Sequence, residues 1–175
     1  MSHRSIVVIL ALVLAAGCSR QAAGPAFVDY RDEQTGFTLR SPGGWVRDPA
    51  TGPGEVRLVP PEEDRSPAEF ISVFTVPAEG RPTEDALRRL VFGLLPIHGV
   101  SGFQQDPRST AGVLWFKFEV TGSSAGIEWA STGVATADTS RAQVAVCAKP
   151  LRAWREGQKE CDEVIRSFRP APPQQ

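Results

Sequence analysis

Apolar and polar positions alternate in several short stretches of the chain, and this period of two predicts β-strands. The segment 113–121 is apolar at every second position, and its other face is mixed because Trp115 alternates with Lys117 and Glu119. The segment 70–76 is apolar on both faces, which is typical of a strand in a sheet that is covered on both sides. Further strands are expected at 27–30, 37–40, 56–59, 127–136 and 142–148.

Two segments carry apolar residues at helical spacing. Residues 83–95 begin with Thr83, a typical N-cap residue, and end before Pro96. The C-terminal segment 151–168 has the same period, with Gly157 as its weak point. Strands and helices in this order predict an α+β fold, in which a central antiparallel β-sheet of about six to seven strands packs against helices.

The composition agrees with a single domain rich in turns. The 175 residues include 16 glycines and 15 prolines, which favour a sheet with many turns over a helical bundle. The 19 basic and 20 acidic residues give a net charge of −1 without a charged run, so electrostatics do not support nucleic-acid binding. We expect one domain at 27–169 and, from its prolines, a disordered tail at 170–175.

The N-terminus has the pattern of an export signal. Arg4 precedes an apolar run at 6–14, and small residues follow up to Gly17 and Cys18. This arrangement resembles the lipobox of bacterial lipoproteins, which implies a signal peptide at 1–17 and an acylated Cys18 as the first mature residue. An ordinary signal peptide cut elsewhere, with Cys18 incidental, is the alternative. The apolar run is far shorter than the roughly 20 residues of a membrane span.

An acylated Cys18 would hold the protein on a membrane, facing the extracytoplasmic space. The tether at 18–26 leaves only eight residues between Cys18 and Phe27, and these reach about 28 Å when fully extended. Ser19 after the cysteine is, by the same resemblance, compatible with sorting to the outer membrane if the source is a diderm bacterium. The membrane, reached through the lipid, is therefore one expected partner.

Cys147 and Cys161 are the other two cysteines, and such a pair in an exported protein is interpreted first as a disulfide. Bridged Cα atoms lie within about 7 Å of each other. In one straight helix from Pro150, Cys161 would lie about 16 Å from the start of the helix. A bridge would therefore require a break near Gly157 or a helix that begins after it. Two buried thiols are the alternative, whereas a metal or redox role is not favoured because no Cys-x-x-Cys motif is present.

Two short motifs lie near the ends of the expected domain. They are the hairpin residues Tyr30, Gly36, Phe37, Leu39, Pro42, Gly44 and Trp45, and the final run Val164-Ile165-Arg166-Ser167-Phe168. They resemble the opening hairpin and the last helix of PsbP/Mog1-like (DcrB-like) domains. The resemblance covers most of residues 27–169 and implies an α/β/α sandwich, with helices on both faces of the central sheet.

The same resemblance implies a class of function. Members of the family include photosystem accessory proteins, a small GTPase-binding protein and many bacterial envelope lipoproteins, most of them binding or assembly factors. No catalytic motif is common to them. Fold analogy alone is a weak argument for function.

Candidate catalytic residues are few. His98 is the only histidine after residue 17 and is expected in a loop after the mid-chain helix. One histidine does not supply the three protein ligands of a catalytic zinc site. Glu119 and Glu128 lie on neighbouring expected strands and are better explained as solvated sheet residues than as a catalytic pair. Trp115 is the candidate binding residue, because its mixed face is expected to be exposed. We predict no enzyme activity, no metal and no cofactor.

The sequence thus predicts a membrane-anchored extracytoplasmic lipoprotein that binds a protein partner or assists envelope assembly. The alternative is a small-ligand or lipid-binding module that uses a cleft between the sheet and the helix at 83–95. A partner surface should expose a contiguous apolar patch. A ligand module should instead contain an apolar pocket of at least about 300 Å³.

Overall fold

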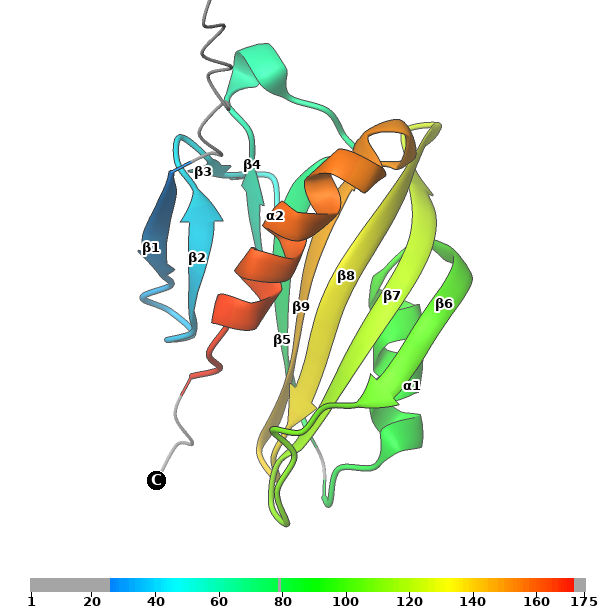
Figure 1. The fold of residues 1–175 in the computed structure, drawn as a ribbon. Helices are drawn as coiled ribbons and strands as arrows, with labels where there is room; N and C mark the ends of the chain where they lie inside the picture. The colour runs from blue at the N-terminus through cyan, green and yellow to red at the C-terminus, as the bar shows by residue number, and fades with distance from the viewer. Residues whose placement is uncertain (1–25, 79, 172–175) are drawn as a thin grey trace, which may run out of the picture.

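The computed structural model describes residues 26–78 and 80–171, which form a seven-stranded antiparallel sheet, a separate two-stranded hairpin and two α-helices (Figure 1). The order of the strands across the large sheet is β3-β4-β5-β9-β8-β7-β6. Their bounds are β3 Val46–Arg47, β4 Glu55–Val59, β5 Phe70–Pro77, β6 Ile97–Gln105, β7 Leu114–Ser124, β8 Ile127–Ala137 and β9 Arg141–Pro150. The antiparallel sheet expected from the alternating pattern is confirmed.

The two faces of this sheet are covered by different helices. Helix α1 (Glu84–Leu94) lies on one face and helix α2 (Trp154–Ser167) lies on the other (Figure 1). Strand β5 shows why two cores form, because its alternate side chains enter each of them: Phe70 and Phe74 pack with α1, and Ile71 and Val73 pack with α2. The expectation that helices cover both faces is confirmed.

The hairpin of β1 (Phe27–Arg31) and β2 (Thr38–Pro42) lies beside α2 (Figure 1). Phe37 and Leu39 are buried with the α2 core, so the hairpin closes one side of that layer. Among the described residues, strand β1 pairs only with β2, so its outer edge has no partner strand. The hairpin therefore adds a second, small sheet with a free edge.

Helix α1 begins where the sequence indicates. The hydroxyl Oγ1 of Thr83 accepts a hydrogen bond from the backbone N–H of Ala86 at 3.2 Å. The next segment differs from the expectation, because His98 lies on strand β6 and not in a loop. Gly99 and Gly102 interrupt the alternating pattern of this edge strand, and its register shifts at both places. For that reason the sequence does not show the alternation of apolar and polar residues that would predict β6.

Cys147 and Cys161 are joined by a disulfide, with Cα atoms 5.2 Å apart. The bridge needs no break at Gly157, contrary to the expectation, because α2 folds back over β9. Three residues of strand carry the chain about 10 Å past Cys147. Seven residues of helix, from Trp154 to Cys161, then carry it back by about the same length.

Gly157 has a different role, because it leaves room for the side chain of Lys149. The ammonium Nζ of Lys149 lies 2.7 Å from Oε1 of Glu69 and 2.9 Å from Oε1 of Glu160, and it lies 5.6 Å from the ring centroid of Trp45. Burial alone would lower the pKa of Lys149, but the hydrogen bonds and charges of the two glutamates outweigh it and raise this pKa. The ion pairs join α2 to β9 and to the loop before β5.

The packed domain also extends beyond its expected end at Arg169. Ala171 is buried, its N–H donates to Oε1 of Gln143 at 3.2 Å, and its carbonyl accepts a hydrogen bond from Arg141 at 2.7 Å. Pro170 and Ala171 therefore belong to the packed domain and not to a disordered tail, whereas residues 172–175 lie outside the described residues. Among residues 26–78 and 80–171, no helix is long and apolar enough to cross a membrane.

Candidate functional site

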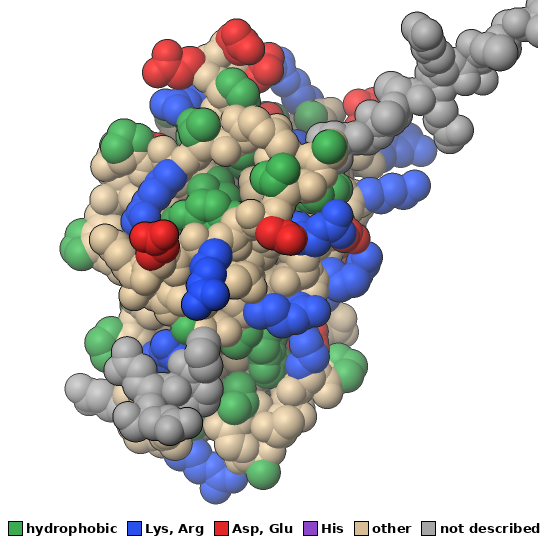
Figure 2. All heavy atoms as spheres, turned by 90° about the vertical axis from the view of Figure 1, so that its left-hand side faces the viewer, with side chains coloured by type: hydrophobic (Ala, Val, Ile, Leu, Met, Phe, Trp, Pro, Cys, Tyr) green, Lys and Arg blue, Asp and Glu red, His purple; other side chains and the backbone are tan. Residues whose placement is uncertain are grey.

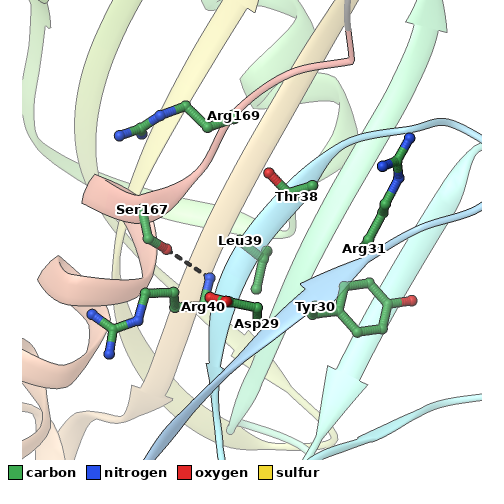
Figure 3. Close-up of a pocket in the computed structure, with 8 residues that line it drawn as sticks. All are labelled: Asp29, Tyr30, Arg31, Thr38, Leu39, Arg40, Ser167 and Arg169. Atoms are coloured by element: carbon green, nitrogen blue, oxygen red, sulfur yellow. Dashed lines mark hydrogen bonds between the residues drawn. The ribbon is translucent and has the colours of Figure 1, made fainter.

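An open groove of about 510 Å³ lies between the β1–β2 hairpin and the end of α2 (Figure 3). Three segments that are far apart in the sequence line it. The lining residues are Asp29, Tyr30 and Arg31 of β1, Thr38, Leu39 and Arg40 of β2, and Ser167 and Arg169 at the end of α2. Three arginines and one aspartate give this groove a basic character.

The hairpin is fixed by a turn built around Asp32, whose side chain is only 1% exposed. Its carboxylate accepts hydrogen bonds from the backbone N–H and the hydroxyl of Thr35, both at 2.7 Å, and it forms an ion pair with Arg47 at 3.2 Å. Gly36 completes the turn with a φ of 78°, which glycine adopts at no steric cost. The strands that line the groove are thus held by a satisfied, buried turn.

The hairpin is joined to the end of α2 by backbone and side-chain hydrogen bonds. Thr38 and Arg169 exchange two backbone hydrogen bonds, at 3.0 and 2.8 Å. The N–H of Arg40 donates to the hydroxyl of Ser167 at 2.7 Å, and that hydroxyl donates to the carbonyl of Val164 at 2.6 Å. These bonds give Ser167, in the final run 164–168, a structural role. They also make the floor of the groove one continuous surface.

The charged groups of the groove differ in how far they are already paired. Arg40 forms an ion pair with Glu163 at 2.7 Å, and the guanidinium of Arg169 donates to two backbone carbonyls. Asp29 and Arg31 form no hydrogen bond or ion pair with any residue that the structure describes. They lie on the same face of β1, opposite Arg40 and Thr38. One carboxylate and one guanidinium therefore remain available to a ligand.

The backbone of β1 is available at the same place. The N–H of Asp32 donates to the carbonyl of Phe37, and the N–H of Gly43 donates to the carbonyl of Ala26. Hydrogen-bonded and non-hydrogen-bonded pairs alternate along an antiparallel ladder, so the backbone groups of residues 27, 29 and 31 point away from β2. The free edge of β1 thus presents unpaired N–H and C=O groups beside the free charges.

The view from the hairpin side shows the surroundings of this edge (Figure 2). Lys and Arg side chains are spread over this face, and acidic side chains lie both at one end of the molecule and among the basic ones at mid-height. Tyr30 adds a neutral aromatic side chain, because burial and the nearby Asp32 raise the pKa of its phenol. The groove is therefore suited to a polar segment that carries a carboxylate.

Trp115 does not lie on an exposed face, contrary to the expectation. It is 7% exposed, its ring meets that of Phe168 edge-on at 6.2 Å, and the guanidinium of Arg108 stacks on it at 4.0 Å. The sequence indicates an open face on β7 because Phe168, which packs on Trp115, is distant along the chain. Trp115 is therefore a core residue, and the exposure that made it the candidate binding residue is absent.

The other residues considered from the sequence are not brought together either. Glu119 lies opposite Thr132 and Glu128 lies opposite Ser123, so the two glutamates do not form a cross-strand pair. His98 is exposed on the edge strand β6. Within the described part of the chain, no group of three histidine, cysteine, aspartate or glutamate side chains could hold a metal ion. Cys18 lies outside the described residues.

The cleft expected between the sheet and α1 is small. The cavity at the start of α1 is about 210 Å³ and is lined mainly by apolar residues, among them Val76, Leu87 and Leu90. This volume is below the roughly 300 Å³ of small-molecule pockets. The exposed large apolar side chains are distributed over six different elements: Val28, Val46, Phe92, Val100, Ile127 and Leu151. Among the described residues, the cleft at α1 is therefore smaller than the expected ligand pocket, and the exposed large apolar side chains form no broad patch.

Sequence reasoning missed the residues that make the groove. The pattern predicts a strand for Asp29 but no site, it leaves Arg31 outside the expected strand at 27–30, and Ser167 enters only as part of a motif that resembles a family. A detectable signal existed in Asp29 and Arg31, which alternate with Val28 and Tyr30 and so share one polar face.

Comparisons with solved structures identify similar folds. The chain is similar to cyanobacterial PsbP (CyanoP) from Synechocystis sp. PCC 6803, with a TM-score of 0.58 and 16% identity over 89% of this chain and 98% of that chain. At this identity the likeness shows the fold alone, and the PsbP-like fold is thereby confirmed. No protein-family model matches the chain, and no curated protein matches it significantly.

Two further structures are less similar. One is a protein of unknown function from Pseudomonas aeruginosa, with a TM-score of 0.46 and 13% identity over 84% of this chain and 99% of that chain. The other is LpqN of Mycobacterium tuberculosis, described as involved in cell envelope biogenesis, with a TM-score of 0.45 and 9% identity over 86% of this chain and 93% of that chain. Neither likeness is strong enough to support a statement about this chain.

Proposed function

We propose that this chain is a lipid-anchored protein of the cell envelope that binds a protein partner and catalyses no reaction. The groove beside the free edge of β1 carries the proposal, since it offers unpaired backbone groups, a free carboxylate on Asp29 and a free guanidinium on Arg31 in one place. An extended partner segment would pair with residues 27, 29 and 31 as an added strand. Its side chains would then meet the charges of the groove.

Two other observations support the location. The pattern of an export signal that ends at Cys18 supports a location outside the cytoplasm, and the disulfide between Cys147 and Cys161 suits an oxidising compartment. The PsbP-like fold is compatible with an accessory role, although folds of one kind host many functions.

Site-specific photo-crosslinking in cells tests the binding site. A photoreactive amino acid replaces Thr38, which lines the groove, and in a matched strain it replaces Thr110, an exposed threonine on the loop between β6 and β7. We expect one discrete crosslinked partner from position 38 and none from position 110. Combining the probe with D29K and R31E should reduce the yield at least tenfold, because both free charges are reversed.

Three results would contradict the binding site. They are the absence of any product at position 38, the same product from both positions, and a product that is insensitive to the charge reversal. Each of the substituted side chains is partly or fully exposed, so an unchanged unfolding midpoint is the control for folding.

A further inference from the structure

The end of the molecule at which the chain enters β1 also carries η1 (Glu62–Asp64), the turn between β7 and β8, and η2 (Leu151–Ala153) (Figure 1). Contacts connect these parts. The N–H of Gly43 donates to the carbonyl of Ala26, and Gly44 lies beside Pro61. The loop after η1 then lines one hollow together with Ser124 of β7. Residue 26 and the β7–β8 turn thus belong to the same end of the domain.

The β7–β8 turn is unusual in its chemistry. Ala125 and Gly126 have φ values of 49° and 79°, as in the tight two-residue turn in which asparagine, aspartate or glycine is favoured at both positions. An alanine there is strained, yet it leaves the tip without a polar side chain. The turn at the opposite end of β8 is polar instead, because Asp138 accepts hydrogen bonds from Ser140 and Arg141. The two ends of the sheet therefore differ in polarity.

Two large apolar side chains flank the alanine turn. Ile127 is 41% exposed and Leu151 is 45% exposed. Both line an open hollow of about 530 Å³ with Gly126, Pro150 and the charged residues Glu128 and Arg152. This small apolar tip has no covering element among the residues that the structure describes.

We propose that this tip rests on the lipid bilayer, with Ile127 and Leu151 inserted at the level of the headgroups. The inference rests on the proposed lipid anchor at Cys18. Only eight residues separate Cys18 from Phe27, which limits the separation to about 28 Å, and Phe27 lies at the same end as the tip. An anchored domain therefore presents this end to the membrane at very high local concentration.

The charges around the tip decide the kind of contact. Arg152 and Arg155 are exposed near it, and so are Glu128 and Glu156. The three carboxylates of η1 at the same end also oppose a strongly anionic surface. The mixed charges favour apolar insertion over electrostatic attraction, so the contact should persist at high salt.

A fluorophore at the tip of the full-length lipidated protein tests the contact. The protein is purified with its own lipid and reconstituted in vesicles of phosphatidylethanolamine and phosphatidylglycerol. An environment-sensitive dye is attached to A125C, which retains Ile127, or to T139C in the turn beyond the far end of β8. The native cysteines do not compete if Cys18 is acylated, because Cys147 and Cys161 are bridged.

We expect the dye at position 125 to shift to the blue and to be quenched by spin-labelled lipids, in 50 mM and in 500 mM salt alike. The dye at position 139 should stay in water. Adding I127E and L151E should abolish at least half of the quenching at position 125. A protein partner on the tip would instead leave the dye unquenched by labelled lipid, which would overturn the proposal.

The failure of the anchor can be distinguished from the failure of the tip contact by vesicle flotation. Protein that floats with the vesicles but shows equal, low quenching at positions 125 and 139 overturns the tip contact alone. Protein that does not float overturns the lipid anchor, and the tip contact with it. Quenching that disappears in 500 mM salt would contradict the apolar insertion.

Discussion

Lys149 supplies charged contacts that attach α2 to the sheet. Its ammonium is paired with Glu69 and Glu160, and its aliphatic stem passes over Gly157. Its side chain is 11% exposed, so little solvent is available to replace these partners. Removing one member of such a buried group leaves the other charges unpaired, which costs more than the group contributes when complete.

Lys149→Met should therefore lower the free energy of unfolding by about 3 kcal/mol, because Glu69 and Glu160 would face each other without a cation. Urea denaturation followed by tryptophan fluorescence measures the change. Lys159→Met on the exposed surface of α2 is the matched control and should shift the free energy by less than about 0.5 kcal/mol. Equal effects of the two substitutions would show that the ion pairs contribute nothing specific.

The raised pKa of Lys149 gives a dependence on pH with a definite sign. A lysine whose pKa is higher in the folded state stabilises the protein fully below its unfolded pKa, about 10.4, and this contribution is lost as the pH rises through the folded pKa. The stability difference between the wild type and Lys149→Met should thus be constant from pH 7 to 9 and should narrow above about pH 10.4. If the stability difference between the two proteins narrowed below pH 9 instead, the pKa of Lys149 would not be raised in the folded state.

At the scale of elements, helix α2 is held on the sheet by one disulfide and one apolar stripe. The stripe comprises Val164, Ile165 and Phe168, all buried. The bridge closes a short loop, since Cys147 and Cys161 are 14 residues apart. The bridge thus adds stability to a helix that is already packed against the sheet by apolar side chains.

The double substitution C147A/C161A should lower the free energy of unfolding by about 3 kcal/mol and leave the domain folded. Chemical denaturation of both proteins with and without reductant measures this. Reductant should destabilise the wild type and leave the double variant unaffected. A double variant that is unfolded in buffer would show that the apolar stripe is insufficient.

Two glycines in helices give opposite expectations for the same substitution. Gly93→Ala in α1 should raise the free energy of unfolding by about 0.5–1 kcal/mol, since nothing lies within 4 Å of the added methyl group. Gly157→Ala in α2 should lower it, because the methyl group would collide with the Lys149 side chain, whose end is held by two glutamates. Stabilisation by Gly157→Ala would mean that Lys149 can move aside freely.

The elements that could be predicted are those whose pattern is local. Strand β5 shows both apolar faces within eight residues, and Thr83 caps α1 through a bond to its own first turn. Strand β6 could not be found, because two glycines and two register shifts interrupt its alternation. From the sequence, the bridge requires a break near Gly157 or a helix that begins after it, because the return of α2 over β9 is a tertiary feature that no local pattern shows.

At the scale of the whole molecule, the groove could not be predicted because it depends on contacts between the two ends of the chain. Arg40 and Ser167 are 127 residues apart, yet their hydrogen bond forms its floor. The burial of Trp115 depends in the same way on Phe168, which arrives from the end of α2. Sequence patterns identify faces of elements, whereas packing decides which faces stay free.

The proposed arrangement gives three parts of the molecule separate tasks. Cys18 would hold the domain on the membrane, the alanine turn would rest on the lipid, and the edge of β1 would remain open to a partner. The anchor and the contact of the turn with the lipid both depend on one covalent modification, the acylation of Cys18. The modification is therefore the first property to measure.

Intact mass spectrometry of the protein purified from membranes, without reductant, tests this most directly. The expected mass is that of a chain beginning at an acylated Cys18 with two hydrogens fewer, for the bridge between Cys147 and Cys161. A mature chain that begins at another residue, with Cys18 absent or carrying a free thiol, would contradict the lipid-anchored protein proposed here.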